Sequence, residues 1–231
     1  MSGANLVFNL ITKHGESSRP TIVSTAIIAG WTGRDKEAME KHIVELEAIG
    51  VKRPAKTPTY YRVAAAHLTT SSEIQVAGDD SSGEAEFILT TIDGRLWVGV
   101  GSDHTDRKVE TTGVTISKQM CEKPVSSQLW PYDEVADHWD KLILRSYVVE
   151  DGQTKLYQEG PVTTMMDPLL LIAGYPAAKA GLTEGSLMFC GTLAAKGGIR
   201  PAPRFIFELE DPVLKRKIGN GYDIVCLPVE G

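Results

Sequence analysis

The sequence has few cysteines, no basic cluster and no long apolar run, and each shortage excludes a class of protein. Its three cysteines, Cys121, Cys190 and Cys226, are too few and too scattered for a disulfide framework or a zinc cluster. Because Cys190 and Cys226 lie in apolar segments, we expect both to be buried thiols in strands. Free thiols are typical of a reducing compartment.

Charge and hydropathy argue against a nucleic-acid-binding, membrane-spanning or secreted protein. The formal net charge is −6, and the sequence has no run of Lys and Arg that could form a basic surface for a phosphate backbone. No nucleic-acid partner is therefore expected. No apolar run approaches the roughly 20 residues of a membrane span. The first residues lack the basic and apolar regions of a signal peptide. We therefore expect a cytoplasmic protein without a membrane partner.

The predicted elements indicate a mixed β/α protein that is mainly β. Residues 6–11 and 21–29 are rich in β-branched and apolar side chains, which predicts two strands. A helix is predicted over residues 36–49, where apolar side chains recur at helical spacing. We interpret residues 1–58 as a small N-terminal ββα subdomain and residues 59–231 as the main, strand-rich domain.

Three acidic residues carry the clearest chemical signal. Glu84 and Glu86 lie two residues apart at the start of a predicted strand, and side chains at that spacing point to the same face. A second strand follows the Asp93-Gly94 turn and ends just before Asp103. Because Glu84 and Asp103 lie about equally far from the turn, an antiparallel hairpin brings them close together.

Carboxylate oxygens are the ligands that hard divalent cations such as Mg²⁺, Mn²⁺ and Ca²⁺ prefer. Two carboxylates from one strand and a third from its neighbour would form half of a coordination shell. The other half would stay open to water or substrate. The alternative is a solvated strand face with Asp103 in a turn, and the spacing alone leaves both interpretations open.

Four short motifs follow one another in an order that resembles a known family. The motifs are residues 102–107, 117–120, 151–153 and 181–195. They are similar to the Asn-Asp-Val-Ser-Ala-Arg segment, the Gly-Lys-Ser-Phe lysine, the Asn-Gly-Glu hairpin and the Gly-Thr-Pro-Ala-Gly strand end of the fumarylacetoacetate hydrolase superfamily. Residues 29–35 also look like a bacterial branch of that superfamily.

The resemblance implies a fold, a cofactor and a set of roles. The fold would be a rolled, partly barrel-like mixed sheet, and the protein would be a homodimer that acts on a small molecule. The metal, Mg²⁺ or Mn²⁺ and alternatively Ca²⁺, would be bound by Glu84, Glu86 and Asp103. Lys118 would contact the substrate, and the substrate end of the site would contain Gly191 and Thr192.

Other side chains are candidates for the same chemistry. Lys118 is predicted to follow a strand over residues 113–116 and to donate to a substrate carboxylate or carbonyl, and Lys123 competes for this role. Arg107 would bind a substrate carboxylate or pair with an acidic neighbour. His67 is a candidate general base, because the histidine that the family carries on a lid has no clear counterpart.

The sequence departs from the family pattern in three places. Ser186 stands where the family has Asp, and Leu193 stands where it has Pro. The interval between Glu86 and Asp103 is shorter than is usual. The missing lid histidine keeps open a further alternative, a non-catalytic protein that binds a metal or a metabolite.

The resulting hypothesis is a metal-dependent hydrolase that cleaves a carbon–carbon bond of a small, acylpyruvate-like oxo acid. A hydratase, decarboxylase or tautomerase with a similar substrate is the alternative among enzymes. The sequence contains no nucleophile elbow, phosphate-binding loop or dinucleotide fingerprint, so covalent serine chemistry and nucleotide binding are not predicted.

Overall fold

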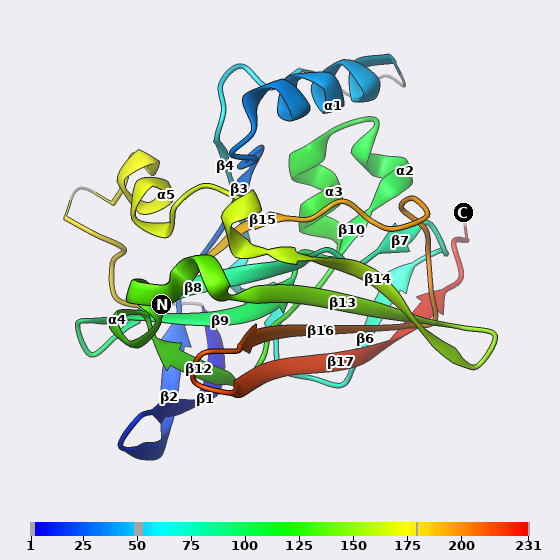
Figure 1. Cartoon of the computed structure of the whole chain (residues 1–231). Coiled ribbons are helices and arrows are strands. Elements are labelled where there is room, and N and C mark those ends of the chain that lie inside the picture. The colour runs from blue at the N-terminus through cyan, green and yellow to red at the C-terminus, as the bar shows by residue number, and fades with distance from the viewer. Residues whose placement is uncertain (1–2, 49–52, 179, 231) are drawn as a thin grey trace.

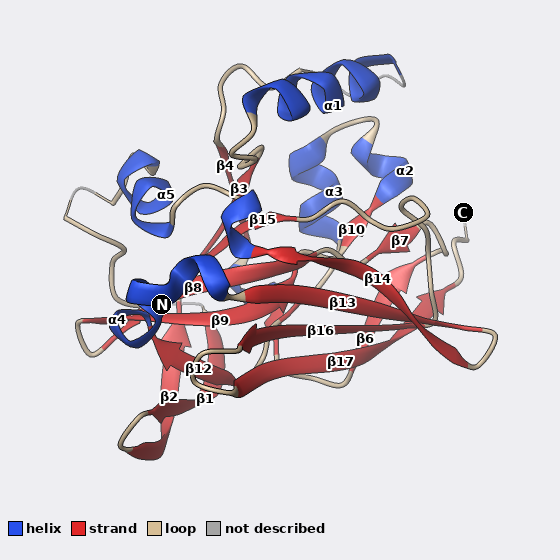
Figure 2. Cartoon of the chain, in the orientation of Figure 1, coloured by secondary structure: helices blue, strands red, loops and turns tan. Residues whose placement is uncertain are grey.

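Two packed β-sheets form the body of the molecule. The computed structural model describes residues 3–48, 53–178 and 180–230. A larger sheet of eight strands curls around its own apolar interior, and a sheet of five strands packs against it (Figures 1 and 2). The predicted mixed fold, mainly β, is confirmed.

The eight-stranded sheet contains both parallel and antiparallel neighbours. In spatial order its strands are β2 (Gly15–Val23), β1 (Ala4–Thr12), β12 (Gln128–Pro131), β9 (Arg95–Ser102), β8 (Ala85–Ile92), β15 (Ser186–Thr192), β3 (Thr25–Gly30) and β4 (Thr59–Val63). The pairs β1–β12 and β15–β3 are parallel. Strands from residues 1–58 thus share one sheet with strands from residues 59–231.

In the second sheet all neighbouring strands are antiparallel except for one parallel edge strand. Its order is β14 (Gln153–Pro161), β13 (Ile143–Glu150), β16 (Arg204–Asp211), β17 (Arg216–Leu227) and β6 (Glu73–Ala77). Two short pairs complete the strands: β7 (Ser81–Ser82) with β10 (Thr105–Asp106), and β5 (Leu68–Thr69) with β11 (Lys123–Pro124).

Short helices connect these strands. They are α1 (Lys36–Ala48), α2 (Arg107–Glu110), α3 (Val114–Met120), α4 (Tyr132–Val135) and α5 (Pro168–Gly174), with 3₁₀ turns at residues 65–67, 136–141 and 162–164. In Figure 1, α1, α2 and α3 lie at the same end of the molecule. Within the described part of the chain, no helix combines the length and the apolar character that crossing a membrane requires.

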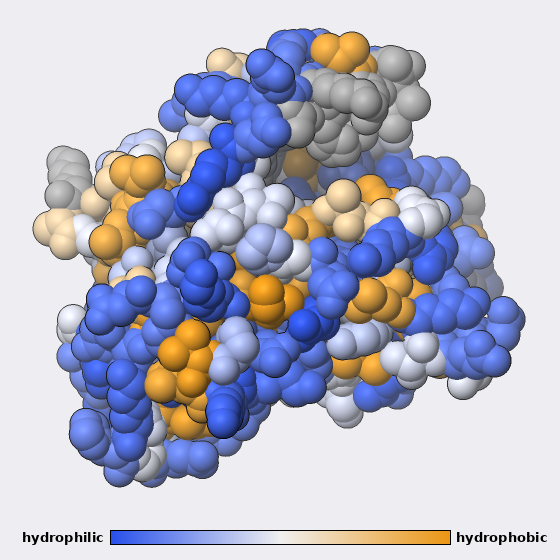
Figure 3. Space-filling view, viewed as in Figure 1, coloured by the Kyte–Doolittle hydropathy of each residue, from blue (hydrophilic) through white to orange (hydrophobic). Residues whose placement is uncertain are grey.

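Strand β8 is buried on both faces, and this position explains its continuous apolar run. Phe87 and Leu89 belong to the core between the two sheets, whereas Ile88 belongs to the core inside the curled sheet. Each such side chain, fully buried, contributes about 1.5–3 kcal/mol to stability. The outer surface differs: on the face in Figure 3, separate apolar patches interrupt a mainly hydrophilic surface.

Both predicted Asp-Gly turns are confirmed. Asp93 and Gly94 have φ angles of 53° and 72° and close the β8–β9 hairpin, in which Ile92 lies opposite Arg95. Asp151 and Gly152 have φ angles of 53° and 73° and join β13 to β14. Two successive positive φ angles are those of the turn that matches the twist of a hairpin.

Two local predictions were wrong. Residues 113–116 do not form a strand, because the chain from Val114 to Met120 is the helix α3. Their β-branched side chains favour a strand only weakly, and the helix buries the Lys118 side chain against Asp103. Cys226 is exposed rather than buried, whereas Cys190 is buried as predicted.

A buried carboxylate ties the end of β16 to distant elements. Asp211 is fully buried and accepts hydrogen bonds from His138 at 2.9 Å, Arg216 at 3.2 Å and the backbone N–H of Leu214 at 3.1 Å. Arg216 also donates to Glu134 at 3.1 Å. Burial alone would raise the pKa of Asp211, but Leu214, His138 and Arg216 outweigh it and lower that pKa.

We predict that Asp211→Asn lowers the free energy of unfolding by about 2–4 kcal/mol at neutral pH, because it removes a buried charge from its donors. A carboxyl whose pKa is lowered by folding stabilises the protein above its unfolded pKa of about 3.9 and loses this effect as the pH falls. The difference between variant and wild type should therefore shrink in denaturant titrations as the pH falls from neutral toward 3.

The matched control is Asp133→Asn. Asp133 pairs with Arg95 at 2.6 Å, but its side chain is 65% exposed. An exposed pair of this kind contributes about 0–1 kcal/mol. Equal losses of stability in the two variants would contradict the role assigned to Asp211.

Candidate metal and substrate site

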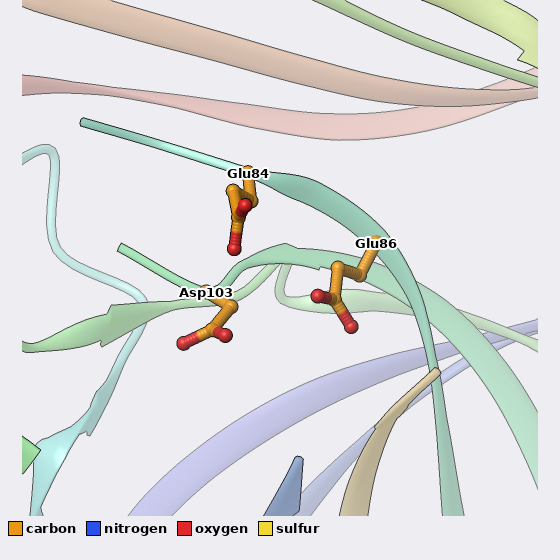
Figure 4. A group of neighbouring side chains, drawn as sticks. All are labelled: Glu84, Glu86 and Asp103. Carbon is orange, nitrogen blue, oxygen red and sulfur yellow. The ribbon is translucent and has the colours of Figure 1, made fainter. Parts of the chain in front are cut away.

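The three predicted carboxylates meet at the open end of the β8–β9 hairpin. Glu84 precedes β8, Glu86 lies within it, and Asp103 follows β9. The N–H of Asp103 donates to the Glu84 carbonyl at 2.9 Å, which continues the ladder beyond the two strands. One ligand oxygen from each side chain lies within 4.8 Å of the others, and the three carboxyl groups point toward one another (Figure 4).

Three cations surround these carboxylates. Lys118 donates to Asp103 and lies 3.6 Å from the nearer Glu84 oxygen. Lys123, which is fully buried, places its Nζ 3.3 Å from Asp103 Oδ1. Arg107 lies 3.3 Å from Glu84 Oε1. The site therefore buries acidic and basic groups together, which offsets much of the cost of removing each charge from water.

The environment separates the pKa values of the carboxyl groups. Burial and the neighbouring Asp103 and Glu84 raise the pKa of Glu86 well above its ordinary value. Burial alone would raise the pKa of Asp103 too, but Lys118 and Lys123 outweigh it and lower that pKa. Asp103 is thus ionised, whereas Glu86 favours its neutral form until a cation approaches.

A glycine holds Glu86 in place. The N–H of Gly191 donates to Glu86 Oε2 at 2.6 Å. Gly191 has a φ of 97°, and a Cβ atom at this position would lie 1.7 Å from the Thr32 hydroxyl oxygen. That hydroxyl donates to the Cys190 carbonyl at 3.0 Å. Gly191 therefore permits a backbone conformation and a close contact that other residues do not.

Thr192 connects the end of β15 to its neighbours. Its hydroxyl donates to the Ala85 carbonyl at 2.8 Å and accepts from the Gln158 side chain at 2.8 Å. Gln158 also donates to the Leu193 carbonyl at 2.6 Å and accepts from the Ala85 N–H at 3.0 Å. The single hydroxyl proton of Thr192 is thus already engaged by the protein.

The donor set fits a hard divalent cation. An ion 2.0–2.6 Å from each ligand can be shared only by oxygens less than about 5 Å apart, and the three carboxylates meet this condition. Asp103 Oδ1 is buried and has no hydrogen-bond partner among the described residues. Although Lys123 Nζ lies 3.3 Å away, this oxygen keeps a lone pair that a metal ion can bind.

A cavity of about 480 Å³ opens beside the carboxylates. Glu84, Glu86, Arg107, Glu110 and Lys118 line one part of it, together with Gly191 and Thr192. Trp31, Met39, Val114 and Ile199 are among the apolar residues that line the rest. The volume lies within the usual range for small-molecule sites.

The structure brings together most of the residues predicted from the sequence. Lys118, Arg107, Gly191 and Thr192 all line the cavity beside the carboxylates. His67 is not among the described residues that line it. The His67 ring nitrogen Nε2 instead lies 2.6 Å from the amide nitrogen of Gln119, so the predicted role of His67 as a base stays a prediction.

The sequence analysis missed several residues of the cavity wall. Glu110 accepts from Arg107 at 3.1 Å, and the spacing of three residues on one helix was a usable signal. Trp31, Gln158 and Tyr157 also line the cavity. Trp31 lies in the segment 29–35 that the family resemblance indicated, but its place in the cavity was not predicted, because segments far apart in the sequence bring these three residues together.

Residues 29–222 match the family described as "Protein of unknown function (DUF2848)". A search of curated proteins gave no match.

Solved structures with the same fold share little sequence with this chain. A fumarylpyruvate hydrolase from Pseudomonas aeruginosa, in complex with Mn²⁺ and pyruvate, has a TM-score of 0.62 at 14% identity, covering 98% of this chain and 99% of its own. A fumarylacetoacetate hydrolase family protein from yeast has a TM-score of 0.62 at 18% identity, with coverages of 89% and 94%. A 2-keto-3-deoxy-D-arabinonate dehydratase has a TM-score of 0.62 at 14% identity, with coverages of 93% and 77%. The chain therefore belongs to the DUF2848 family and has the fold of the fumarylacetoacetate hydrolase superfamily.

Proposed function

We propose that the protein is a divalent-metal-dependent hydrolase that cleaves a carbon–carbon bond of a small, acylpyruvate-like oxo acid. The observation that carries the proposal is the convergence of Glu84, Glu86 and Asp103 within 4.8 Å beside a cavity of about 480 Å³. The solved structure with Mn²⁺ and pyruvate supports the same assignment, since its fold is similar. Mg²⁺ or Mn²⁺ is the proposed metal.

The charge of the site favours an anionic substrate. When Glu84, Glu86 and Asp103 are all ionised, as they would be around a metal, Lys118, Lys123 and Arg107 balance their charge. A divalent cation would then leave the site positive, even when the carboxylate of Glu110 is counted. An oxo acid brings both a carboxylate and a chelating oxo group, so it suits this charge.

Each side chain has a distinct role in the proposed reaction. Glu84, Glu86 and Asp103 would hold the metal, which when bound supplies a Lewis acid for the oxo group and for water. Lys118 and Arg107 line the cavity and would bind the substrate carboxylate. Glu110 also lines the cavity but lies outside the proposed metal ligands, and it would accept the proton of the attacking water.

A dehydratase is the second candidate function. The similar fold of the 2-keto-3-deoxy-D-arabinonate dehydratase favours it, because the same electrophilic site suits proton abstraction beside an oxo group. A non-catalytic metabolite-binding protein would show binding without turnover. The homodimer implied by the family resemblance stays a prediction, to be checked by light scattering.

We predict that Glu86→Gln lowers the affinity for Mn²⁺ by roughly 100-fold or more, because it replaces a charged ligand by a neutral amide. Calorimetric titration measures the change. Glu73→Gln on β6 is the matched control, since Glu73 is exposed and lies outside the cavity. Wild-type affinity in Glu86→Gln would contradict the metal assignment.

We predict that Gly191→Ala also weakens Mn²⁺ binding, by roughly tenfold or more, because the added Cβ displaces the N–H that positions Glu86. The control is Gly94→Ala: its φ of 72° is also positive, but no atom lies within 4 Å of the added Cβ. Both variants carry backbone strain of about 1–2 kcal/mol. A loss of affinity that is equal in both would assign the effect to strain rather than to Glu86.

The proposed reaction is tested with a set of acylpyruvates and Mg²⁺ or Mn²⁺, following the loss of the substrate absorbance. We expect metal-dependent hydrolysis that a chelator abolishes. Lys118→Met should lower kcat/KM by roughly 10- to 100-fold, because one charged hydrogen bond to the substrate is lost, while Mn²⁺ binding persists. Absence of turnover in the whole set, with Mn²⁺ bound, would reject the hydrolase and leave the dehydratase or binding protein.

A further inference from the structure

Apart from the charged residues already named, the lining of the cavity is largely apolar, with Asp35 as a further acidic residue. Its apolar wall is formed by Trp31, Met39, Tyr61, Val114, Leu193 and Ile199. These residues come from the ends of β3 and β15, from α1, β4 and α3, and from the loop after β15. Several separate segments of the fold thus converge on one apolar surface beside a strongly charged one.

Trp31 is held in this wall in an unusual backbone conformation. Its φ is 60°, which is rare for a bulky residue. The following residue fixes the segment: Thr32 accepts from the Met166 N–H at 2.8 Å and donates to the Cys190 carbonyl at 3.0 Å. The Trp31 indole N–H donates to the Tyr61 hydroxyl at 3.0 Å. Strain that the surrounding structure maintains in this way marks a functional position.

The Gln158 and Tyr157 side chains beside this wall are already engaged by the protein. The Gln158 amide donates to Thr192 and Leu193, and the Tyr157 hydroxyl accepts from the Arg200 N–H at 3.2 Å. Among the described residues that line the cavity, the cations are Arg107 and Lys118, and both lie beside the carboxylates. A second acid group on the substrate, placed away from these carboxylates, would therefore meet no cation among the described lining residues.

The cavity is larger than a pyruvate-sized head requires. At about 30 Å³ for each water in the liquid, 480 Å³ holds on the order of 15 non-hydrogen atoms. The head of the substrate, with its carboxylate and oxo group, belongs at the charged end. More than half of the volume remains for a substituent, and the lining outside the charged residues is largely apolar.

We propose that the substrate is an oxo acid with one carboxylate and an apolar alkyl or aryl substituent, which lies against Trp31, Met39 and Ile199. The inference rests on the proposed function, because the acid head is placed at the metal site. It adds the class of substituent and excludes a dicarboxylic substrate. Ile199 is 53% exposed and forms the rim of this apolar end.

The test compares two ligands of equal chain length on the Mn²⁺-loaded protein. 2-Oxohexanoate carries an alkyl end and 2-oxoadipate carries a carboxylate there, and pyruvate serves as the reference head. Calorimetry should give a Kd for 2-oxohexanoate about tenfold lower than those for pyruvate and 2-oxoadipate. Pyruvate lacks the methylenes whose burial strengthens binding, and the second carboxylate of 2-oxoadipate would lose water without gaining a cation.

Ile199→Lys changes the charge of the rim without touching the carboxylates. We expect the preference for 2-oxohexanoate over 2-oxoadipate to fall by about tenfold or more, because the added cation pairs with the second carboxylate. Ile22→Lys is the matched control, since Ile22 is 60% exposed on β2 and does not line the cavity. It should leave the preference unchanged.

The outcomes separate this inference from the proposed reaction. Equal or tighter binding of 2-oxoadipate, no binding of any of the three acids, or an unchanged preference in Ile199→Lys would overturn the inference. A clear preference for 2-oxohexanoate without any acylpyruvate hydrolysis would support it and reject the hydrolase alone. Hydrolysis of acylpyruvates with a preference for 2-oxoadipate would support the hydrolase and reject the inference about the substituent.

Discussion

The burial of three carboxylates with three cations is the constraint on which this site depends. An unpaired charge in the interior costs several kcal/mol, so the acids at the end of the β8–β9 hairpin must have cations delivered to them. The α2–α3 segment delivers Arg107 and Lys118, and β11 delivers Lys123. The course of the chain from residue 107 to residue 123 follows from this requirement.

The acids and the cations of this site differ in how far the sequence could predict them. The three acids were predictable because two local relations bring them together: alternation along one strand and the register of one hairpin. The helix at Lys118 was not, because residues 113–116 carry β-branched side chains and the attraction to Asp103 is not visible locally. Local propensity is weak beside a buried ion pair.

Long-range pairing sets the rest of the site. Gly191 reaches Glu86 only because β15 pairs with β8. On its other side β15 pairs with β3, which lies more than 150 positions earlier in the sequence. The family resemblance indicated the residues around Gly191 but not the contact with Thr32 that requires glycine there. The resemblance of residues 29–35 did not predict the backbone conformation of Trp31, since that conformation depends on hydrogen bonds made by residues 32 and 166.

The charged residues of the cavity form a coupled network, whereas its apolar residues come from separate segments of the fold. The residues proposed for the reaction therefore differ from those proposed for substrate selectivity. The charged end is a network in which Asp103, Lys118 and Glu84 depend on one another, so a change in one charge alters the others. The apolar wall consists of side chains from separate segments, with rim residues such as Ile199 partly exposed. Because an exposed apolar side chain has few obligatory partners, the wall can vary while the buried network keeps its balance.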